Sequence, residues 1–221
     1  MIILSDKTIK LAFYCSASLT ILFIFVLILN AFYIPKAAEI DMSEIAVLSQ
    51  PIQKETIVSE FVVSRKGKEL KVIPLADFDI NGVVVSTKRY YSGFDAAVVP
   101  IDIGIVWGEI TKPENIANIY FEQIVRFLRY RITGDLPFGY DYINKNVANI
   151  HAVPANKKIK RVLNSINKYD KVHLKGYLIQ IESISNKNYR RRSSLTRDDT
   201  GDGACEVMWI NHVKINHKIY Y

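Results

Sequence analysis

The stretch Tyr169–Ser183, YDKVHLKGYLIQIES, decides how the main part of this 221-residue chain folds. Its apolar side chains alternate, as they do in a strand with one buried face, but the alternation moves to the other face after Gly176. A bulge has this effect, because one extra residue bends the strand and reverses its faces. We therefore expect a strongly bent sheet or a small barrel.

Further segments have the alternation and the β-branched composition of strands. They lie within residues 55–76 (two strands), 81–91, 96–110, 189–196 and 205–215. Gly67 supplies the positive φ of a turn between the first two strands. Pro100 places its own strand at a sheet edge or a bulge. The last two strands are expected to form a hairpin.

Two helices are expected among these strands. Thr111, Pro113 and Glu114 form a capping box with proline in the first turn, and the helix that follows is predicted to reach about residue 123. The next segment, 126–132, fits a helix or a strand, and 133–150 is rich in loop residues. A second helix lies within 154–169, with one apolar face made by Ile159, Val162, Leu163 and Ile166. The fold class is therefore α+β.

The N-terminal part has the composition of a transmembrane helix. Residues 11–34 contain no charged side chain, and a helix of this length reaches about 36 Å, enough to cross a hydrocarbon core of about 30 Å. A cleaved signal peptide is the main alternative, but its apolar region is shorter and is followed by small residues. Here Pro35 and Lys36 follow, so a retained anchor is favoured over a cleaved signal and over a buried core helix.

The flanking charges predict the orientation. Lys7 and Lys10 precede the span, and positive charge stays in the cytoplasm. We expect a cytoplasmic N-terminus (1–10), a transmembrane helix (11–34), a tether (35–56) and an extracytoplasmic domain (57–221). In a bacterium the chain would be a single-pass protein of the inner membrane, with its C-terminal domain in the periplasm or outside.

The net charge of +7 favours acidic partners. Outside a membrane these are anionic lipid headgroups, acidic polysaccharide or another envelope protein, and not nucleic acid. Two arginine clusters are candidate contacts for an anion or a partner: Arg190, Arg191 and Arg192, and Arg126, Arg129 and Arg131. The alternative is a solvated strand face.

The segment SSLTRDDTGDGACE, 193–206, allows four interpretations. A tight turn between strands is favoured, because Asp and Gly clusters make such turns. A calcium loop would use Asp198 and Asp202, but Trp209 stands where the bidentate Glu belongs. An aspartic protease would use Asp199, although that residue follows two charged residues and not an apolar strand.

The fourth interpretation is a nucleophile site. Ser193, Ser194, Thr196 and Cys205 are the candidate nucleophiles, and His151, His173 and His212 are the candidate bases. None of them stands in a recognised catalytic signature. Cys205 is the one thiol outside the predicted span, so it is expected to be buried and inert, with an intermolecular bridge or a reactive thiol as alternatives. Phosphate loops and paired metal ligands are not found, so no cofactor and no metal are predicted.

Residues 151–210, with HAVPANKKIKRVL, DKVHLKGYLIQI and RRSSLTRDDTGDGACEVMWI, resemble an uncharacterised group of bacterial single-pass membrane-anchored proteins. Their shared signature is Ser-Leu-x-Arg-x-Asp-Thr-Gly-x-Gly-Ala-Cys-Glu. The resemblance implies a bacterial source and carries no activity. We expect a protein-interaction or scaffold component of an envelope complex, such as a secretion apparatus. The alternatives are an envelope hydrolase or peptidase that uses 193–206, and a binder of anionic lipid or polysaccharide.

Overall fold

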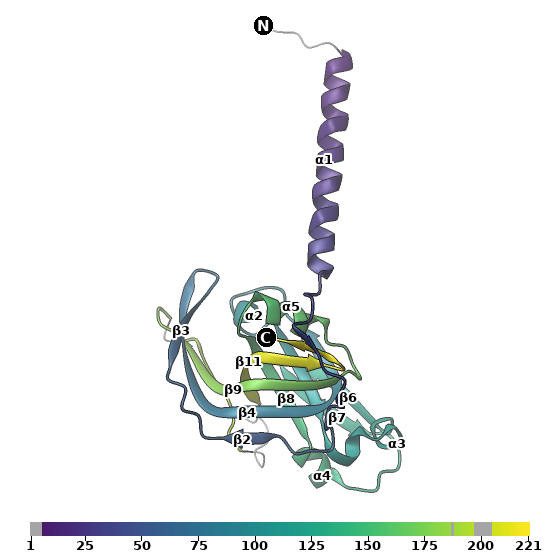
Figure 1. The fold of residues 1–221 in the computed structure, drawn as a ribbon, viewed down its shortest axis with the longest axis vertical. Coiled ribbons are helices and arrows are strands. Elements are labelled where there is room, and N and C mark those ends of the chain that lie inside the picture. The colour runs from purple at the N-terminus through teal and green to yellow at the C-terminus, as the bar shows by residue number, and fades with distance from the viewer. Residues whose placement is uncertain (1–5, 187, 197–204) are drawn as a thin grey trace. The chain divides into compact units, whose positions relative to one another are not determined.

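The computed structural model of the chain describes residues 6–186, 188–196 and 205–221, and it divides into two compact units after Pro35. The first unit contains α1 (Asp6–Phe32) (Figure 1). Among the described residues this is the one helix long and apolar enough to cross a membrane, as an anchor or as a signal sequence. Its apolar window, Phe13–Asn30, is not buried inside the protein.

The second unit, 36–221, is built on a sheet of ten described strands. These are β1 (Glu39–Ile40), β2 (Ile52–Lys54), β3 (Phe61–Arg65), β4 (Lys68–Arg89), β5 (Ile101–Val106), β8 (Val147–Pro154), β9 (Lys171–Ser183), β10 (Arg190–Arg192), β11 (Glu206–Ile215) and β12 (Lys218–Tyr220). The order is β1-β12-β11-β8-β5-β4-β9-β10, and β2 and β3 also pair with β4.

The sheet bends until five of its strands form a closed circuit of pairings. β11 pairs with β8 and also with β9, so the circuit runs β4-β5-β8-β11-β9 and back to β4. Only the β8–β11 pair in this circuit is parallel. Figure 1 shows β4 and β9 as long, curved strands, which confirms the expected bending of the sheet. The main apolar cluster includes Ile80, Ile103, Ile150, Leu174 and Met208, from all five strands.

The irregularity predicted at Gly176 is found where β9 meets β11. Gly176 pairs with Ile210, and the register shifts before His212, so that Asn211 is the extra residue. The bulged residue therefore belongs to the partner strand and not to β9. A Cβ on Gly176 would lie 1.8 Å from the carbonyl oxygen of Trp209, so only glycine allows the two backbones to approach this closely.

The second predicted helix is confirmed as α5 (Lys157–Ser165), which follows β8 and precedes β9. The side chain of Asn156 caps it by accepting a hydrogen bond of 2.9 Å from the backbone N–H of Ile159. The apolar face predicted from the sequence packs into the main cluster through Ile159, Val162, Leu163 and Ile166.

The first predicted helix is much shorter than expected. Within it, α3 (Pro113–Ile116) ends after one turn, and its N-cap is Lys112 and not Thr111. A hairpin of β6 (Ile119–Ile124) and β7 (Phe127–Ile132) follows, so the helix predicted to residue 123 was wrong. Val125 and Arg126 form its turn with φ of 45° and 70°. Left-handed turns usually contain Gly or Asn, so nothing in the sequence marked this one.

Three other expectations differ from the structure. The loop-rich segment 133–150 contains α4 (Tyr140–Lys145) and the start of β8. The strand expected at 96–110 is divided into α2 (Asp95–Val98), β5 and a 3-10 turn (Gly108–Thr111). Pro100 lies directly before β5, which is a central strand and not an edge. Proline is tolerated at this position because no backbone N–H is needed there for a ladder hydrogen bond.

The last two predicted strands do not form a hairpin with each other in the described residues. β10 pairs with β9, whereas β11 pairs with β8, β9 and β12. One backbone hydrogen bond, of 3.2 Å, runs from the N–H of Ser194 to the carbonyl of Cys205. In the bent sheet β11 forms its ladders with β8 and β9, and not with β10, the strand that precedes it in the chain. Residues 197–204 lie outside the described residues, and with them Asp198, Asp199 and Asp202.

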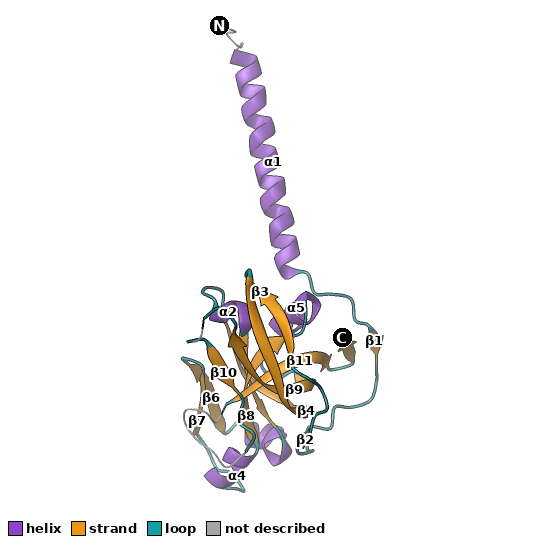
Figure 2. Cartoon of the chain, turned by 90° about the vertical axis from the view of Figure 1, so that its left-hand side faces the viewer, coloured by secondary structure: helices purple, strands orange, loops and turns teal. Residues whose placement is uncertain are grey.

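The segment predicted as a tether, 35–56, contributes β1 and β2 to the sheet of the second unit (Figure 2). The ammonium group of Lys214, on β11, is buried and lies 2.6 Å from Oδ2 of Asp41. It also donates to the carbonyl of Ser43 at 2.9 Å. A buried ammonium needs such partners, so this part of the chain is fixed to the sheet.

Candidate functional site

Two neighbouring strands place a carboxylate opposite an imidazole. Asp102 on β5 and His151 on β8 are direct partners in the antiparallel register. Nδ1 of His151 lies 2.9 Å from Oδ1 of Asp102. Asp102 is fully buried, and His151 is 6% exposed. Because side chains alternate along a strand, this pair lies on the face opposite to Ile103 and Ile150 of the main core.

Cys205 brings a thiol to the same imidazole. It directly precedes β11, whose parallel register places Glu206 opposite Ile150 of β8. Cys205 and His151 line the same cavity, and the sulfur interacts with the imidazole. Nδ1 of this histidine faces Asp102, on the opposite side of the ring from Nε2. A thiol, an imidazole and a carboxylate are the chemical groups of which catalytic triads can be made.

The surroundings of His151 favour its charged form. Burial by itself lowers the pKa of this imidazole, but hydrogen bonds and charge interactions with Asp102 and Cys205 outweigh burial and raise the pKa to about 9. The imidazolium therefore predominates near neutral pH. In cysteine enzymes the thiolate is the nucleophile, and a neighbouring imidazolium favours it.

Three donors hold the Asp102 carboxylate. His151 and Nη1 of Arg126 share Oδ1, the latter at 2.9 Å, and the hydroxyl of Tyr90 donates to Oδ2 at 2.9 Å. Burial, reinforced by the charge of Asp102, raises the pKa of Tyr90, so its hydroxyl stays protonated as a donor. The guanidinium of Arg126 also stacks on the Tyr90 ring, 3.7 Å from its centroid. These three donors thus fix the orientation of the Asp102 carboxyl group.

The β6–β7 hairpin carries Arg126 to this carboxylate. The hairpin lies over β5 at Gly104, where a Cβ would come within 2.8 Å of Cδ1 of Leu128. Glycine at this position therefore lets the hairpin approach the sheet. The left-handed turn directs the Arg126 guanidinium inward, where Nη2 also lies 2.7 Å from Oδ2 of Asp95.

Asp95 links Arg126, which binds Asp102, to Arg191 of β10. Arg191 binds it with two parallel contacts, from Nε to Oδ1 at 2.8 Å and from Nη2 to Oδ2 at 2.9 Å, and the hydroxyl of Tyr189 donates to Oδ1 at 3.0 Å. Burial by itself raises the pKa of Asp95, but Arg191 and Arg126 outweigh it and lower the pKa. The two carboxylates neutralise these two arginines.

Cys205 and His151 line a cavity of about 430 Å³. Arg126, Arg190, Arg191 and Arg192 also line it, together with the apolar residues Val125, Phe127 and Val207. Arg190 and Arg192 donate to the same neutral oxygen, Oε1 of Gln180, at 2.6 and 3.0 Å. Neither makes a carboxylate salt bridge within the described residues, and the amide oxygen that holds both of them carries no net charge.

The structure separates the arginines that the sequence grouped as contacts. Arg190, Arg191, Arg192 and Arg126 meet at the cavity, although they come from two distant segments. Arg129 and Arg131 are exposed on β7, and Arg131 lies over the ring of Tyr120. The first four belong to the candidate site, whereas the last two do not.

The other candidate nucleophiles and bases have separate roles. Ser194 binds the carbonyl and the N–H of Thr196, and the hydroxyl of Ser193 accepts from the N–H of Val207, so both shape the backbone. His173 lies 2.6 Å from Asp79 and 5.8 Å, ring to ring, from His212. Of the candidate nucleophiles and bases, Cys205 and His151 line one cavity. The described residues hold no group of three or more metal ligands.

Sequence reasoning missed Asp102, Asp95, Tyr90 and Asn149. Asp102 had a signal, because it is the one charged residue in the apolar run VVPIDIGIVW, 98–107. A carboxylate in a buried strand needs partners. Asn149 precedes His151 by two residues on β8 and so shares its face.

Comparison of the chain with protein-family models, curated proteins and solved structures gives no match, so the chemistry of this site is argued from its geometry.

Proposed function

We propose that this protein is a thiol enzyme that cleaves or transfers an acyl group through a thioester on Cys205. The observation that carries this proposal is the line of contacts from Cys205 through His151 to the buried Asp102, at the wall of a cavity. It develops the hydrolase alternative, with Cys205 as nucleophile in place of Ser194 or Asp199.

The reaction follows from the protonation states. The Cys205 thiolate attacks the carbonyl carbon of an amide or ester, and a carbon–sulfur bond forms. The His151 imidazolium gives its proton to the leaving amine or alcohol as the old bond breaks. The neutral imidazole then takes a proton from water or from an acceptor hydroxyl, which attacks the thioester and releases the thiolate. Asp102 orients the ring throughout.

Asn149 is suited to stabilise the oxyanion of this reaction. Its Nδ2 lies 3.2 Å from Sγ of Cys205 and donates to the carbonyl of Arg126 at 2.8 Å. Its Oδ1 accepts from Nε2 of Gln123 at 2.8 Å, which fixes the orientation of the amide. One N–H is thus directed to the sulfur, beside which the negative oxygen develops.

The closed circuit of five strands supports a finer description of the fold. We propose a small Greek-key barrel of the OB type, in which the face of the second and third strands and the nearby loops bind ligands. β5 and β8 are the second and third strands of this circuit, and they carry Asp102 and His151. This analogy supports the place of the site and not its chemistry.

The substrate we propose carries an acidic group near the scissile carbonyl. Arg190 and Arg192 lie at the cavity and are held by a neutral amide oxygen. A carboxylate or phosphate of the substrate would meet two guanidinium groups there. This proposal keeps the expected preference for acidic partners and assigns it to two of the six predicted arginines, Arg190 and Arg192.

We propose that α1 is retained as a single-pass anchor, with the second unit in the periplasm or outside. The length and composition of α1 support this, as do Lys7 and Lys10, which lie in its first turns before the apolar window. A role as a scaffold in an envelope complex, with other envelope proteins as partners, stays a prediction.

Alkylation of Cys205 tests the proposed function. The full chain, carrying Cys15→Ser, is treated with iodoacetamide in a neutral detergent and followed by mass spectrometry. We expect the rate near neutral pH to exceed that of free cysteine, and His151→Ala to lower it by about 10-fold. His151→Ala should also change the pH profile of alkylation, because the imidazole beside the sulfur is removed.

The control is His217→Ala, which changes an exposed histidine outside the site. It should leave the rate unchanged. If His151 and Asp102 serve only to stabilise the fold, His151→Ala should lower the unfolding midpoint but leave the pH profile of Cys205 alkylation unchanged. That outcome would refute the proposed function.

A further inference from the structure

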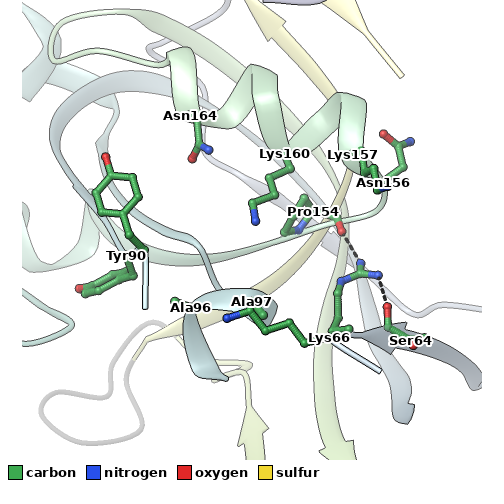
Figure 3. Close-up of a pocket in the computed structure, with 12 residues that line it drawn as sticks. Ser64, Lys66, Tyr90, Ala96, Ala97, Pro154, Asn156, Lys157, Lys160 and Asn164 are labelled. Carbon is green, nitrogen blue, oxygen red and sulfur yellow. Dashed lines mark hydrogen bonds between the residues drawn. The ribbon is translucent and has the colours of Figure 1, made fainter. Parts of the chain in front are cut away.

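A second cavity, of about 690 Å³, lies between α5, α2 and the β3–β4 turn. Figure 3 shows Lys160 and Asn164 projecting from α5, with Tyr90 on the far side and Ala96 and Ala97 of α2 below. Four basic residues line this cavity: Arg65, Lys66, Lys157 and Lys160. None of the described residues that line it is Asp or Glu.

Neutral groups hold two of these cations in place. Arg65 donates from Nη2 to the carbonyl of Pro154 at 2.8 Å and from Nη1 to that of Ser64 at 3.1 Å. Lys66 donates to the carbonyl of Gly93 at 3.2 Å. Carbonyl oxygens orient a cation but do not neutralise its charge, so both groups remain able to bind an anion.

The cations also repel one another. Burial lowers the pKa of Lys160, and the positive charges of Arg65 and Lys66 lower it further. Burial also lowers the pKa of Arg65. Bringing these charges together costs folding free energy, and a bound anion would reverse the sign of this interaction.

The far end of the cavity offers polar groups of another kind. Oδ1 of Asn164 is buried and has no hydrogen-bond partner among the described residues, and a small rotation of the side chain would bring it to a ligand hydroxyl. Tyr90 and Tyr91 line the same end. The volume exceeds that of a single phosphate ion and leaves room for a small polyol.

We infer that this cavity binds a phosphate ester that also carries hydroxyl groups, such as glycerol phosphate. Arg65 would take two phosphate oxygens, the lysines would supply point charges, and Asn164 would accept from a hydroxyl. The phosphate ester is either a soluble molecule or the headgroup of an anionic phospholipid. This cavity shares Tyr90 with the thiol site, but ligand binding to it is measured without any thiol reaction.

Ligand binding by the full chain in a neutral detergent tests this inference. The probes are glycerol 3-phosphate and short-chain phosphatidylglycerol, with sodium chloride at matched ionic strength as the blank. Near 100 times the dissociation constant, each bound probe should raise the unfolding midpoint by several degrees. Lys157→Ala with Lys160→Ala should weaken binding by about 10-fold or more.

The matched control is Lys168→Ala with Lys171→Ala, which removes two exposed lysines outside the cavity. It should bind both probes like the unchanged protein. Circular dichroism of each variant checks that α5 is folded. The inference fails if neither probe raises the midpoint, or if the cavity variant binds as tightly as the control.

The two probes also identify the source of the phosphate. Tighter binding of short-chain phosphatidylglycerol, lost in the cavity variant, supports a lipid headgroup. Equal or tighter binding of glycerol 3-phosphate, lost in the same variant, supports a soluble ligand. Binding of the lipid that persists in the cavity variant reflects the apolar surface of α1, and it overturns the inference.

Discussion

Asp102 and His151 are direct cross-strand partners, and Oδ1 of the first lies 2.9 Å from Nδ1 of the second. Side chains in this relationship are as close as a sheet allows, so the pairing of β5 with β8 is enough to fix the contact. A rigid sheet, and not a loop, therefore sets the geometry of the base.

The stability of the second unit should fall as pH rises through about 9, because the pKa of His151 is raised to that value from an ordinary value of 6.5. When the pKa of a histidine is higher in the folded state than in the unfolded state, its protonated form stabilises the fold. This stabilisation is fully present at a pH below the unfolded-state pKa and is lost at a pH above the folded-state pKa. Between about pH 6.5 and 9.5 we expect a loss of roughly 3 kcal/mol in the free energy of unfolding. Denaturant titration followed by Trp107 and Trp209 fluorescence measures it.

His151→Gln is the control for this pH dependence. The variant is less stable near neutral pH, but its free energy of unfolding should vary much less over the same range. If the variant keeps the full slope, other groups cause it and the raised pKa of His151 is refuted.

Val125→Gly should stabilise the protein by about 1 kcal/mol. Val125 is β-branched, has a left-handed φ of 45° and is 78% exposed. Its side chain therefore buries too little apolar surface to offset the strain of this backbone conformation. Thermal unfolding of the full chain in detergent measures the change. Val62→Gly is the comparison, because Val62 is exposed on a regular strand, and it should be destabilising. Equal effects of the two substitutions would contradict strain at Val125.

Gly176→Ala should destabilise the second unit by about 3 kcal/mol or more, because the added Cβ forces β9 and β11 apart. Denaturant titration measures the loss. Gly139→Ala is the matched control, since an added Cβ there meets nothing within 4 Å, and it should change stability little. A tolerated alanine at Gly176 would show that the bend does not depend on this close approach.

A reporter enzyme fused after Tyr221 tests the proposed orientation. Alkaline phosphatase, which needs an oxidising compartment, should be active, and a cytoplasmic reporter at the same position should be inactive. Moving the two lysines at positions 7 and 10 to the other end of the apolar window of α1 is expected to weaken this difference. Activity of the cytoplasmic reporter alone would reverse the topology.

Local patterns predicted the elements that repeat over several residues. The apolar face of α5, the turn at Gly67 and the bend at Gly176 all follow from spacing within one segment. The β6–β7 hairpin was missed because its apolar residues also fit a helical period and its turn lacks glycine. In that segment the contacts with β5 decide between two conformations that the local sequence allows.

By itself the sequence determined the apolar N-terminal helix, the α+β class and the bending of the sheet, because these depend on hydrophobic periodicity along short stretches. Only the tertiary structure decided that Cys205 belongs with His151 and Asp102, and that β11 pairs with β8 and not with β10. The physical reason is strand register. It depends on which distant strands bury their apolar faces together, and that free energy belongs to the whole sheet and not to any one segment.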